Sequence, residues 1–213
     1  MEATRLIAVR HGETAWNVET RIQGQLDIGL NKTGVWQARR VAQALADEPI
    51  AAIYSSDLSR AWETALAIAA PHGLEVEPEL RLRERAFGRF EGMSFAEIDG
   101  TLPEQARLWR RRDPVFAPEG GENLLDFRDR VTGAASELAA RHPGKLILLV
   151  AHGGVMDVLY RAATHQELQA PRTWHLGNAC INRVLWTPGG FSLIGWGDAS
   201  HLETAPSDDA SAD

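Results

Sequence analysis

The sequence holds a single cysteine, Cys180, and it does not open with a basic stretch followed by a long apolar run. One cysteine excludes a disulfide within the chain, and without the apolar opening we expect no secretory leader and a cytoplasmic location. Positive charge is also scarce, because 22 Lys and Arg stand against 29 Asp and Glu, for a formal net charge of −7. This balance argues against nonspecific binding of nucleic acid, and we expect no membrane partner.

Motifs for metal ions and nucleotides are missing as well. The sequence has no His-x-x-x-His pair and no cluster of Asp and Glu typical of a metal site. It also lacks the Gly-x-x-x-x-Gly-Lys loop that binds nucleotide phosphates. We therefore expect neither a metal nor another cofactor.

The length and composition favour one domain with one sizeable core, since 213 residues are 44% hydrophobic and no shift in composition divides them. Strand and helix patterns alternate, which predicts an α/β fold with three layers, α/β/α, around a mostly parallel sheet. The domain is expected over residues 1–203, with 93–123 as a lid-like insertion. Residues 204–213 are small and acidic, and are expected to form a disordered tail.

Apolar runs and helical periodicity give the expected elements. Predicted strands are Leu6–Val9, Ala51–Tyr54, a short one at Leu74–Val76, Leu146–Val150, and an edge hairpin of Ile181–Trp186 and Phe191–Trp196. Three helices are predicted. The first is capped by Asn31 and runs to about Asp47, with its inward-facing residues at Val35, Ala38, Val41, Ala42 and Leu45. The second is polar, covers Met93–Arg112 and is interrupted at Asp99-Gly100, and the third covers Leu124–Ala140.

Three of the predicted strands each lead to a basic side chain. The first ends in Arg10-His11-Gly12, the second is followed by Asp57 and Arg60, and the third runs into His152. We expect Asp57 to cap the next helix and to place Arg60 in its first turn. Since ligands of open α/β sheets bind at the carboxyl ends of the strands, these side chains are expected to share one site.

Four motifs, in order and spacing, resemble the histidine phosphatase superfamily, in the branch of cofactor-dependent phosphoglycerate mutases and their phosphatase relatives. They are Arg10-His11-Gly12-Glu13-Thr14 with Asn17, Ser55-Ser56-Asp57-Leu58 with Arg60, Ala61 and Thr64, Leu82-Arg83-Glu84 with Phe87-Gly88 and Glu91-Gly92, and Ala151-His152-Gly153-Gly154. The resemblance runs from about Leu6 to His201. It implies a phosphoglycerate mutase-like fold and phosphoryl-transfer chemistry.

Phosphoryl transfer depends on positioning and on neutralising the phosphoryl oxygens. The guanidinium groups of Arg10 and Arg60 match phosphate bidentately. The resemblance makes His11 the nucleophile that forms phosphohistidine, while His152 donates to the phosphoryl oxygens as a cation. We expect the two arginines to lower the pKa of His11, and a bound phosphate dianion to raise the pKa of His152.

The proton for the departing alkoxide is assigned by the resemblance to Glu84. A surface salt bridge is the alternative, because Arg81, Arg83 and Arg85 are near in sequence. Against it, the Phe87 to Phe90 segment predicts a partly apolar wall that would keep the carboxyl protonated.

Further substrate contacts are expected from Asn17, the Gln23-Gly24 pair and Gly153. Arg111, in the Trp109 to Arg112 segment, is expected to bind a carboxylate or second phosphate, with a solvated helix face as the alternative. The other five histidines are expected in surface or structural roles, although the Asp198 to His201 segment leaves a contact with substrate open.

The function expected is metal-independent hydrolysis of small phosphomonoesters through phosphohistidine. A cofactor-dependent phosphoglycerate mutase and a non-catalytic phospholigand-binding module are the alternatives. The short stretch between Trp109 and Gly120 favours hydrolysis, because a shorter cover admits water. The partner expected is a small anionic phosphorylated substrate, and the sequence leaves a homodimer open.

Overall fold

The computed structural model describes residues 2–203, so the predicted acidic tail, 204–213, lies outside the described residues. Six strands form one sheet in the order β3-β2-β4-β1-β5-β6. Strands β1 to β4 are parallel, whereas β5 is antiparallel to β1 and to β6. The strands are β1 (Thr4–Arg10), β2 (Ile50–Ser55), β3 (Val76–Pro78), β4 (Leu146–Ala151), β5 (Ile181–Thr187) and β6 (Gly190–Asp198).

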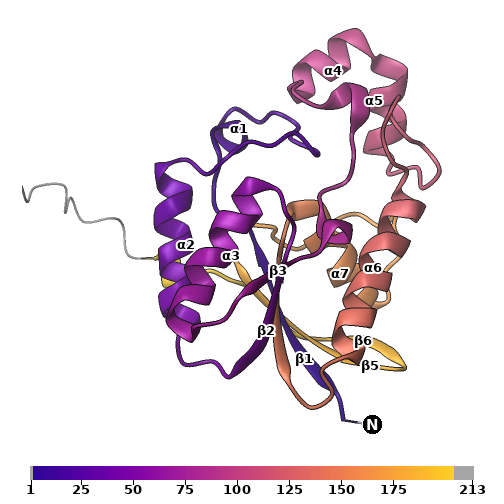
Figure 1. Cartoon of the computed structure of the whole chain (residues 1–213). Coiled ribbons are helices and arrows are strands. Elements are labelled where there is room, and N and C mark those ends of the chain that lie inside the picture. The colour runs from indigo at the N-terminus through magenta and orange to yellow at the C-terminus, as the bar shows by residue number, and fades with distance from the viewer. Residues whose placement is uncertain (1, 204–213) are drawn as a thin grey trace, which may run out of the picture.

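Helices cover both faces of this sheet, with α2 and α3 on one side and α6 and α7 on the other (Figure 1). The α-helices are α1 (Ala15–Val18), α2 (Lys32–Leu45), α3 (Ser59–His72), α4 (Phe95–Thr101), α5 (Pro103–Arg110), α6 (Leu124–Ala140) and α7 (Gly153–Thr164); short 3₁₀ helices are η1 (Leu80–Leu82), η2 (Gly88–Phe90) and η3 (Ser200–Leu202). The predicted α/β class with a mostly parallel sheet is confirmed.

Alternate residues of the strands build two separate halves of the core, as the twofold side-chain period of a strand requires. In β1, Leu6 and Ala8 pack with α6 and α7, while Ile7 and Val9 pack with α2 and α3. All six residues of β4 are buried. The continuous apolar run at 146–150 therefore reflects a central strand that is covered on both faces.

Helix α2 begins as predicted, because the Asn31 side chain accepts a hydrogen bond of 2.8 Å from the Gly34 N–H. The predicted inward stripe is wrong at Val35, which is 38% exposed, and Gly34 is buried in its place. A Cβ at Gly34 would lie 2.1 Å from the Glu13 carbonyl oxygen. The helix therefore packs its backbone directly against the turn that follows β1.

Asp57 does not cap α3. The N-cap is Leu58, without a side-chain cap, and the Ser59 N–H donates to Asp27 Oδ1 at 2.7 Å. Both Asp57 carboxylate oxygens instead accept hydrogen bonds from Arg83, at 2.6 and 2.5 Å. Arg60 nevertheless lies in the first turn of α3, as predicted. The third strand also differs, since β3 begins at Val76, the residue that pairs with Ile53, rather than at Leu74.

Residues 93–123, which we call the cap, carry α4 and α5 beyond the carboxyl ends of the strands, at the end of the molecule remote from the N-terminus (Figure 1). The break between the helices falls at Leu102, and Pro103 starts α5, instead of the predicted interruption at Asp99-Gly100. Ile98 and Ala106 pack with Ile22 and Phe90 in a small hydrophobic cluster of their own. Among the residues described, no helix is long and apolar enough to cross a membrane.

Candidate active site

The carboxyl ends of β1, β2 and β4 meet at one edge of the sheet and bring the predicted basic residues together. The His11 N–H donates to the Ala151 carbonyl at 2.9 Å, and the Ser56 N–H donates to the Val150 carbonyl at 3.0 Å. The rings of His11 and His152 lie 5.2 Å apart between centroids. Residues separated by 141 positions thus share one site because their strands are neighbours.

His11 is buried, and its Nδ1 lies 2.7 Å from the Gly12 carbonyl oxygen. A carbonyl can only accept, so Nδ1 carries the proton and Nε2 keeps its lone pair. Burial, followed by the charges of Arg10 and Arg60, lowers the pKa of His11 well below its ordinary value. The predicted direction is confirmed, although burial is the larger cause. The geometry is that of a neutral imidazole with a free nucleophilic nitrogen.

His152 is fully buried, and its Nε2 lies 2.8 Å from the Ser56 Oγ. Its Nδ1 has no hydrogen-bond partner. Burial, and then the charges of Arg60 and His11, lower the pKa of His152 well below its ordinary value. The surroundings of His152 therefore favour the neutral ring, and the predicted cation would need a bound dianion to stabilise it.

Arg10 and Arg60 are anchored by backbone carbonyls. Arg10 donates from Nη1 to Leu176, and Arg60 donates to Leu26 at 2.8 Å and to Gly24 at 2.7 Å. The Nε atom of each guanidinium is buried without a partner. Burial lowers the pKa of Arg60 to about 10 and also lowers the pKa of Arg10. Both groups remain cations at neutral pH, with donors fixed before any ligand binds.

Asn17 lies in α1, the Gln23-Gly24 pair lies in the loop between α1 and α2, and all three residues line the same pocket. Asn17 Oδ1 accepts from the Thr14 N–H at 3.0 Å, which leaves the amide NH₂ as its outward donor. Gly24 has a φ of +52°, and a Cβ there would lie 2.2 Å from Glu91 Oε1. Glycine is therefore required for the turn that presents Gln23.

Glu84 reaches the site from the segment between η1 and the cap. Its two carboxylate oxygens accept hydrogen bonds from the Arg85 N–H at 2.7 Å and the Gly154 N–H at 2.9 Å. Of the predicted apolar wall, Phe87 lines the pocket together with Glu84, whereas Phe90 lies in the cluster of the cap and Phe127 of α6 lines the pocket as well. The salt bridge with a neighbouring arginine is also not formed, since Arg83 binds Asp57.

These residues open into a pocket of about 590 Å³. Arg10, His11, Arg60, Glu84 and Gly153 line its base, and aromatic side chains line its walls: Trp16, Phe87, Phe95, Trp109, Phe127 and Trp174. His152 lies behind this surface, against His11.

Arg111 does not line the pocket. It lies with Asp99 and Arg107 at a depression on the outside of the cap, and the neighbouring Arg112 lines the pocket instead. Arg112 has a φ of +52°, and this turn at the end of α5 reverses which arginine faces inward. A sequence pattern of three adjacent arginines could not tell them apart.

Sequence reasoning missed several residues that hold the site together. Thr64 Oγ1 accepts from the Gly12 N–H at 3.1 Å, and the Asn178 side chain donates to the His11 carbonyl at 3.0 Å. Ser56 was quoted in a motif without a role, yet it binds His152. Thr64 belongs to the same motif, one helical turn after Arg60, and likewise had no predicted role. Asn178 carries no such signal.

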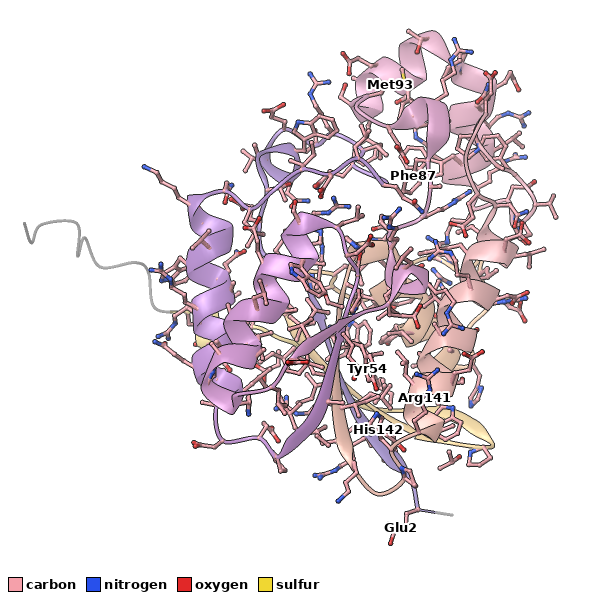
Figure 2. The ribbon with its side chains drawn as sticks, viewed as in Figure 1. Glu2, Tyr54, Phe87, Met93, Arg141 and His142 are labelled. Carbon is pink, nitrogen blue, oxygen red and sulfur yellow. The ribbon has the colours of Figure 1, made fainter. Side chains whose placement is uncertain are left out.

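The remaining histidines lie largely apart from this site. His142 binds the Tyr54 hydroxyl at 2.8 Å, at the end of the molecule opposite Phe87 and Met93 (Figure 2). His201 is buried, with Nε2 lying 3.0 Å from the Ala179 carbonyl oxygen, and it does not line the pocket. His175 is exposed as expected, but it does line the pocket. The described residues contain no group of three or more His, Cys, Asp or Glu suited to a metal ion.

Comparison with known proteins agrees with this geometry. Residues 6–199 match the histidine phosphatase superfamily, branch 1. The chain is 41% identical to phosphoglycerate mutase-like protein 4 of Arabidopsis thaliana, over 95% of this chain and 89% of that one. It is 37% identical to the metal-independent phosphoserine phosphatase of the same plant, over 95% and 85%. The solved structure of mycobacterial glucosyl-3-phosphoglycerate phosphatase with VO₃ superimposes with a TM-score of 0.81 at 35% identity, over 92% and 99%.

The fold and the site thus define an α/β enzyme of phosphoryl transfer, and the chain belongs to the histidine phosphatase superfamily. Within that superfamily its relatives include a phosphoserine phosphatase and glucosyl-3-phosphoglycerate phosphatases, each named for a small phosphorylated metabolite.

Proposed function

We propose that the protein hydrolyses small phosphomonoesters without a metal ion, through a phosphohistidine formed on His11. The observation that carries this proposal is the hydrogen bond from His11 Nδ1 to Gly12, which fixes the tautomer and leaves Nε2 unprotonated at the base of the pocket. A neutral imidazole flanked by fixed guanidinium groups is suited to attack on a phosphorus atom.

In the first step the Nε2 lone pair of His11 attacks phosphorus, an N–P bond forms and the ester P–O bond breaks. The departing oxygen takes a proton from the carboxyl group of Glu84, which lines the pocket and contacts the Gly154 N–H at the start of α7. In the second step water attacks the phosphohistidine and returns its proton to Glu84, and inorganic phosphate leaves. The N–P bond breaks and His11 recovers its neutral form.

Arg10, Arg60 and Asn17 line the pocket and supply donors for the phosphoryl oxygens. The unpartnered Nδ1 of His152, behind the lining and beside His11, is a further proposed donor to a bound phosphoryl oxygen. Two fixed cations and several N–H donors stabilise the transition-state charge that Mg²⁺ neutralises in other phosphoryl-transfer enzymes. The phosphoserine and glucosyl-3-phosphoglycerate esters named for the relatives are the first substrates to assay.

The test is release of inorganic phosphate from p-nitrophenyl phosphate and a panel of alkyl phosphates. Phosphate release is expected to persist in excess chelator, to be inhibited by vanadate and to disappear in His11→Ala. Thr187→Ser, a conservative change in β5 far from the pocket, serves as the control for expression and handling. Loss of activity in chelator that added Mg²⁺ restores would contradict the metal-independent mechanism.

Two further expectations from the sequence accompany this proposal. The single cysteine, which is buried and free, supports a reducing cytoplasmic location. Light scattering on the purified full chain tests the homodimer.

A further inference from the structure

The pocket extends well beyond the phosphoryl site, and its outer wall carries a carboxylate. Asp157, on α7, is only 4% exposed and lines the pocket. Its Oδ2 accepts hydrogen bonds from Arg112 at 2.5 Å and Arg161 at 3.0 Å. Its Oδ1 has no hydrogen-bond partner, although the Nε of Arg172 lies 3.6 Å away. Buried acceptors in proteins are normally hydrogen-bonded, so Oδ1 is expected to accept from a donor on a bound ligand.

A buried donor lines the same pocket. Trp174 is 8% exposed, and its Nε1 has no hydrogen-bond partner. Its indole ring is fixed, because Tyr160 stacks on it at 4.1 Å and the Arg161 guanidinium lies 4.7 Å from its centroid. Arg161 thus contacts both Trp174 and Asp157. The unpartnered donor and the unpartnered acceptor belong to one rigid group of side chains.

The position of this group sets which part of a substrate reaches it. Asp157 follows Gly153 by four residues on α7, which places it about 6 Å along the helix axis from the phosphoryl site. The pocket volume of about 590 Å³ lies within the range of roughly 300–1,000 Å³ typical for drug-sized ligands. A leaving group several bonds long is therefore needed to span from His11 to Asp157.

The chemistry of the two unpartnered atoms distinguishes among leaving groups. A carboxylate or phosphate can accept from Trp174 but cannot donate to Asp157, and an ammonium can donate to Asp157 but cannot accept from Trp174. A serine moiety would need two separate groups, its carboxylate on Trp174 and its ammonium on Asp157. A hydroxyl group does both. We propose that Asp157 and Trp174 form a hydroxyl-binding subsite, so that the preferred substrates are phosphomonoesters of sugars or polyols. This inference rests on the proposed phosphatase function.

The test compares sugar and polyol phosphates with their monodeoxy derivatives, by kcat/KM for phosphate release. For the best substrate, at least one deoxy derivative is expected to be about 10- to 100-fold poorer, since hydrogen bonds to charged groups are worth that factor. p-Nitrophenyl phosphate, which has no hydroxyl group, reports phosphatase activity alone. Its His11-dependent hydrolysis tests the proposed function separately from the subsite.

Trp174→Phe keeps the aromatic ring and removes the N–H. This variant is expected to reduce the preference for the hydroxylated substrate over its deoxy derivative toward one, chiefly by lowering kcat/KM for the hydroxylated compound about tenfold. Trp62→Phe, on α3 and outside the pocket, is the matched control and should keep the wild-type preference.

Three results would overturn the subsite. One is an equal kcat/KM for every hydroxylated and deoxy pair in the wild type. Another is an equal loss on both members of the pair in Trp174→Phe, since that outcome describes a structural residue. The third is a tenfold higher kcat/KM for phosphoserine or 3-phosphoglycerate than for all sugar and polyol phosphates.

Discussion

At the scale of single residues, both histidines of the site are kept neutral, because the fold buries them beside arginines. Burial removes the water that would solvate an imidazolium, and Arg10 and Arg60 add repulsion. A neutral His11 is what the proposed nucleophile requires, so the two arginines proposed to bind phosphate also keep the attacking nitrogen unprotonated. The cost appears in stability, because unfolding frees both rings to bind protons.

This cost gives a pH dependence of known sign. The pKa values of His11 and His152 are lowered in the folded state, so below about pH 6.5 the unfolded chain binds more protons and stability falls as pH falls. Each histidine should contribute about 1.4 kcal/mol of loss between pH 7.5 and 5.5. Urea unfolding measures this interval, and His152→Gln should lose about 1.4 kcal/mol less than the wild type. An equal loss in both proteins would refute the assignment.

Glu84→Gln tests the proton donor. The amide oxygen can still accept from the Gly154 N–H, whereas the amide NH₂ cannot accept from the Arg85 N–H, so the variant removes the transferable proton together with one hydrogen bond. We expect alkyl phosphates to lose about 10² to 10⁴ in kcat, and p-nitrophenyl phosphate to lose little, because a phenolate of low basicity leaves without a proton. Equal losses on both classes of substrate would make Glu84 a structural residue.

The start of α7 shows how one element fixes the site. Its first two residues are Gly153 and Gly154. An added Cβ at Gly153 would lie 3.4 Å from Arg10 Nε, whereas an added Cβ at Gly154 would lie 2.2 Å from Glu84 Oε1 and 3.1 Å from Phe127. Gly154→Ala is therefore expected to displace Glu84 and to lower kcat for alkyl phosphates at least tenfold more than Gly153→Ala does.

A third variant separates this effect from helix propensity. A Cβ at Gly133, in the middle of α6, would meet nothing within 4 Å. Gly133→Ala should therefore raise the free energy of unfolding by about 0.5–1 kcal/mol. If Gly153→Ala and Gly154→Ala reduce kcat equally, contact with Glu84 is not what requires glycine.

The strand-helix alternation and the strand-end motifs were readable from the sequence because local periodicity and a buried parallel strand leave clear patterns. His11, Arg60 and His152 met as predicted, since parallel strands present their carboxyl ends on one edge. The structure of the cap was predicted less accurately. Its helix break and its inward-facing Arg112 depend on tertiary packing and on a left-handed turn, which adjacent arginines in a sequence do not reveal.

At the scale of the whole molecule, we propose that the cap determines whether water reaches the intermediate. A mutase must exclude water while its intermediate reorients, whereas a phosphatase must admit water to the phosphohistidine. The short cap, with its small cluster around Phe90, leaves a pocket of about 590 Å³ above His11. We propose that water reaches the intermediate through this space.

Incubation with 3-phosphoglycerate tests that proposal. We expect inorganic phosphate to form with little 2-phosphoglycerate, and 2,3-bisphosphoglycerate to give no stimulation. Following both products in the same reaction measures the partition. Isomerisation that exceeds phosphate release by tenfold, a barrier difference of roughly 1.4 kcal/mol, would identify a mutase instead.

The covalent intermediate is the central claim, and rapid quenching with ³²P-labelled substrate tests it most directly. The quench must avoid acid, because phosphohistidine is labile to acid and stable to alkali. Label is expected on the peptide that contains His11, and it is expected to be absent from His11→Ala. In His152→Ala the label is expected to remain on the His11 peptide, because this variant retains the attacking nitrogen. Label on the peptide of His152, or an alkali-labile phosphoryl group on any other residue, would contradict the account.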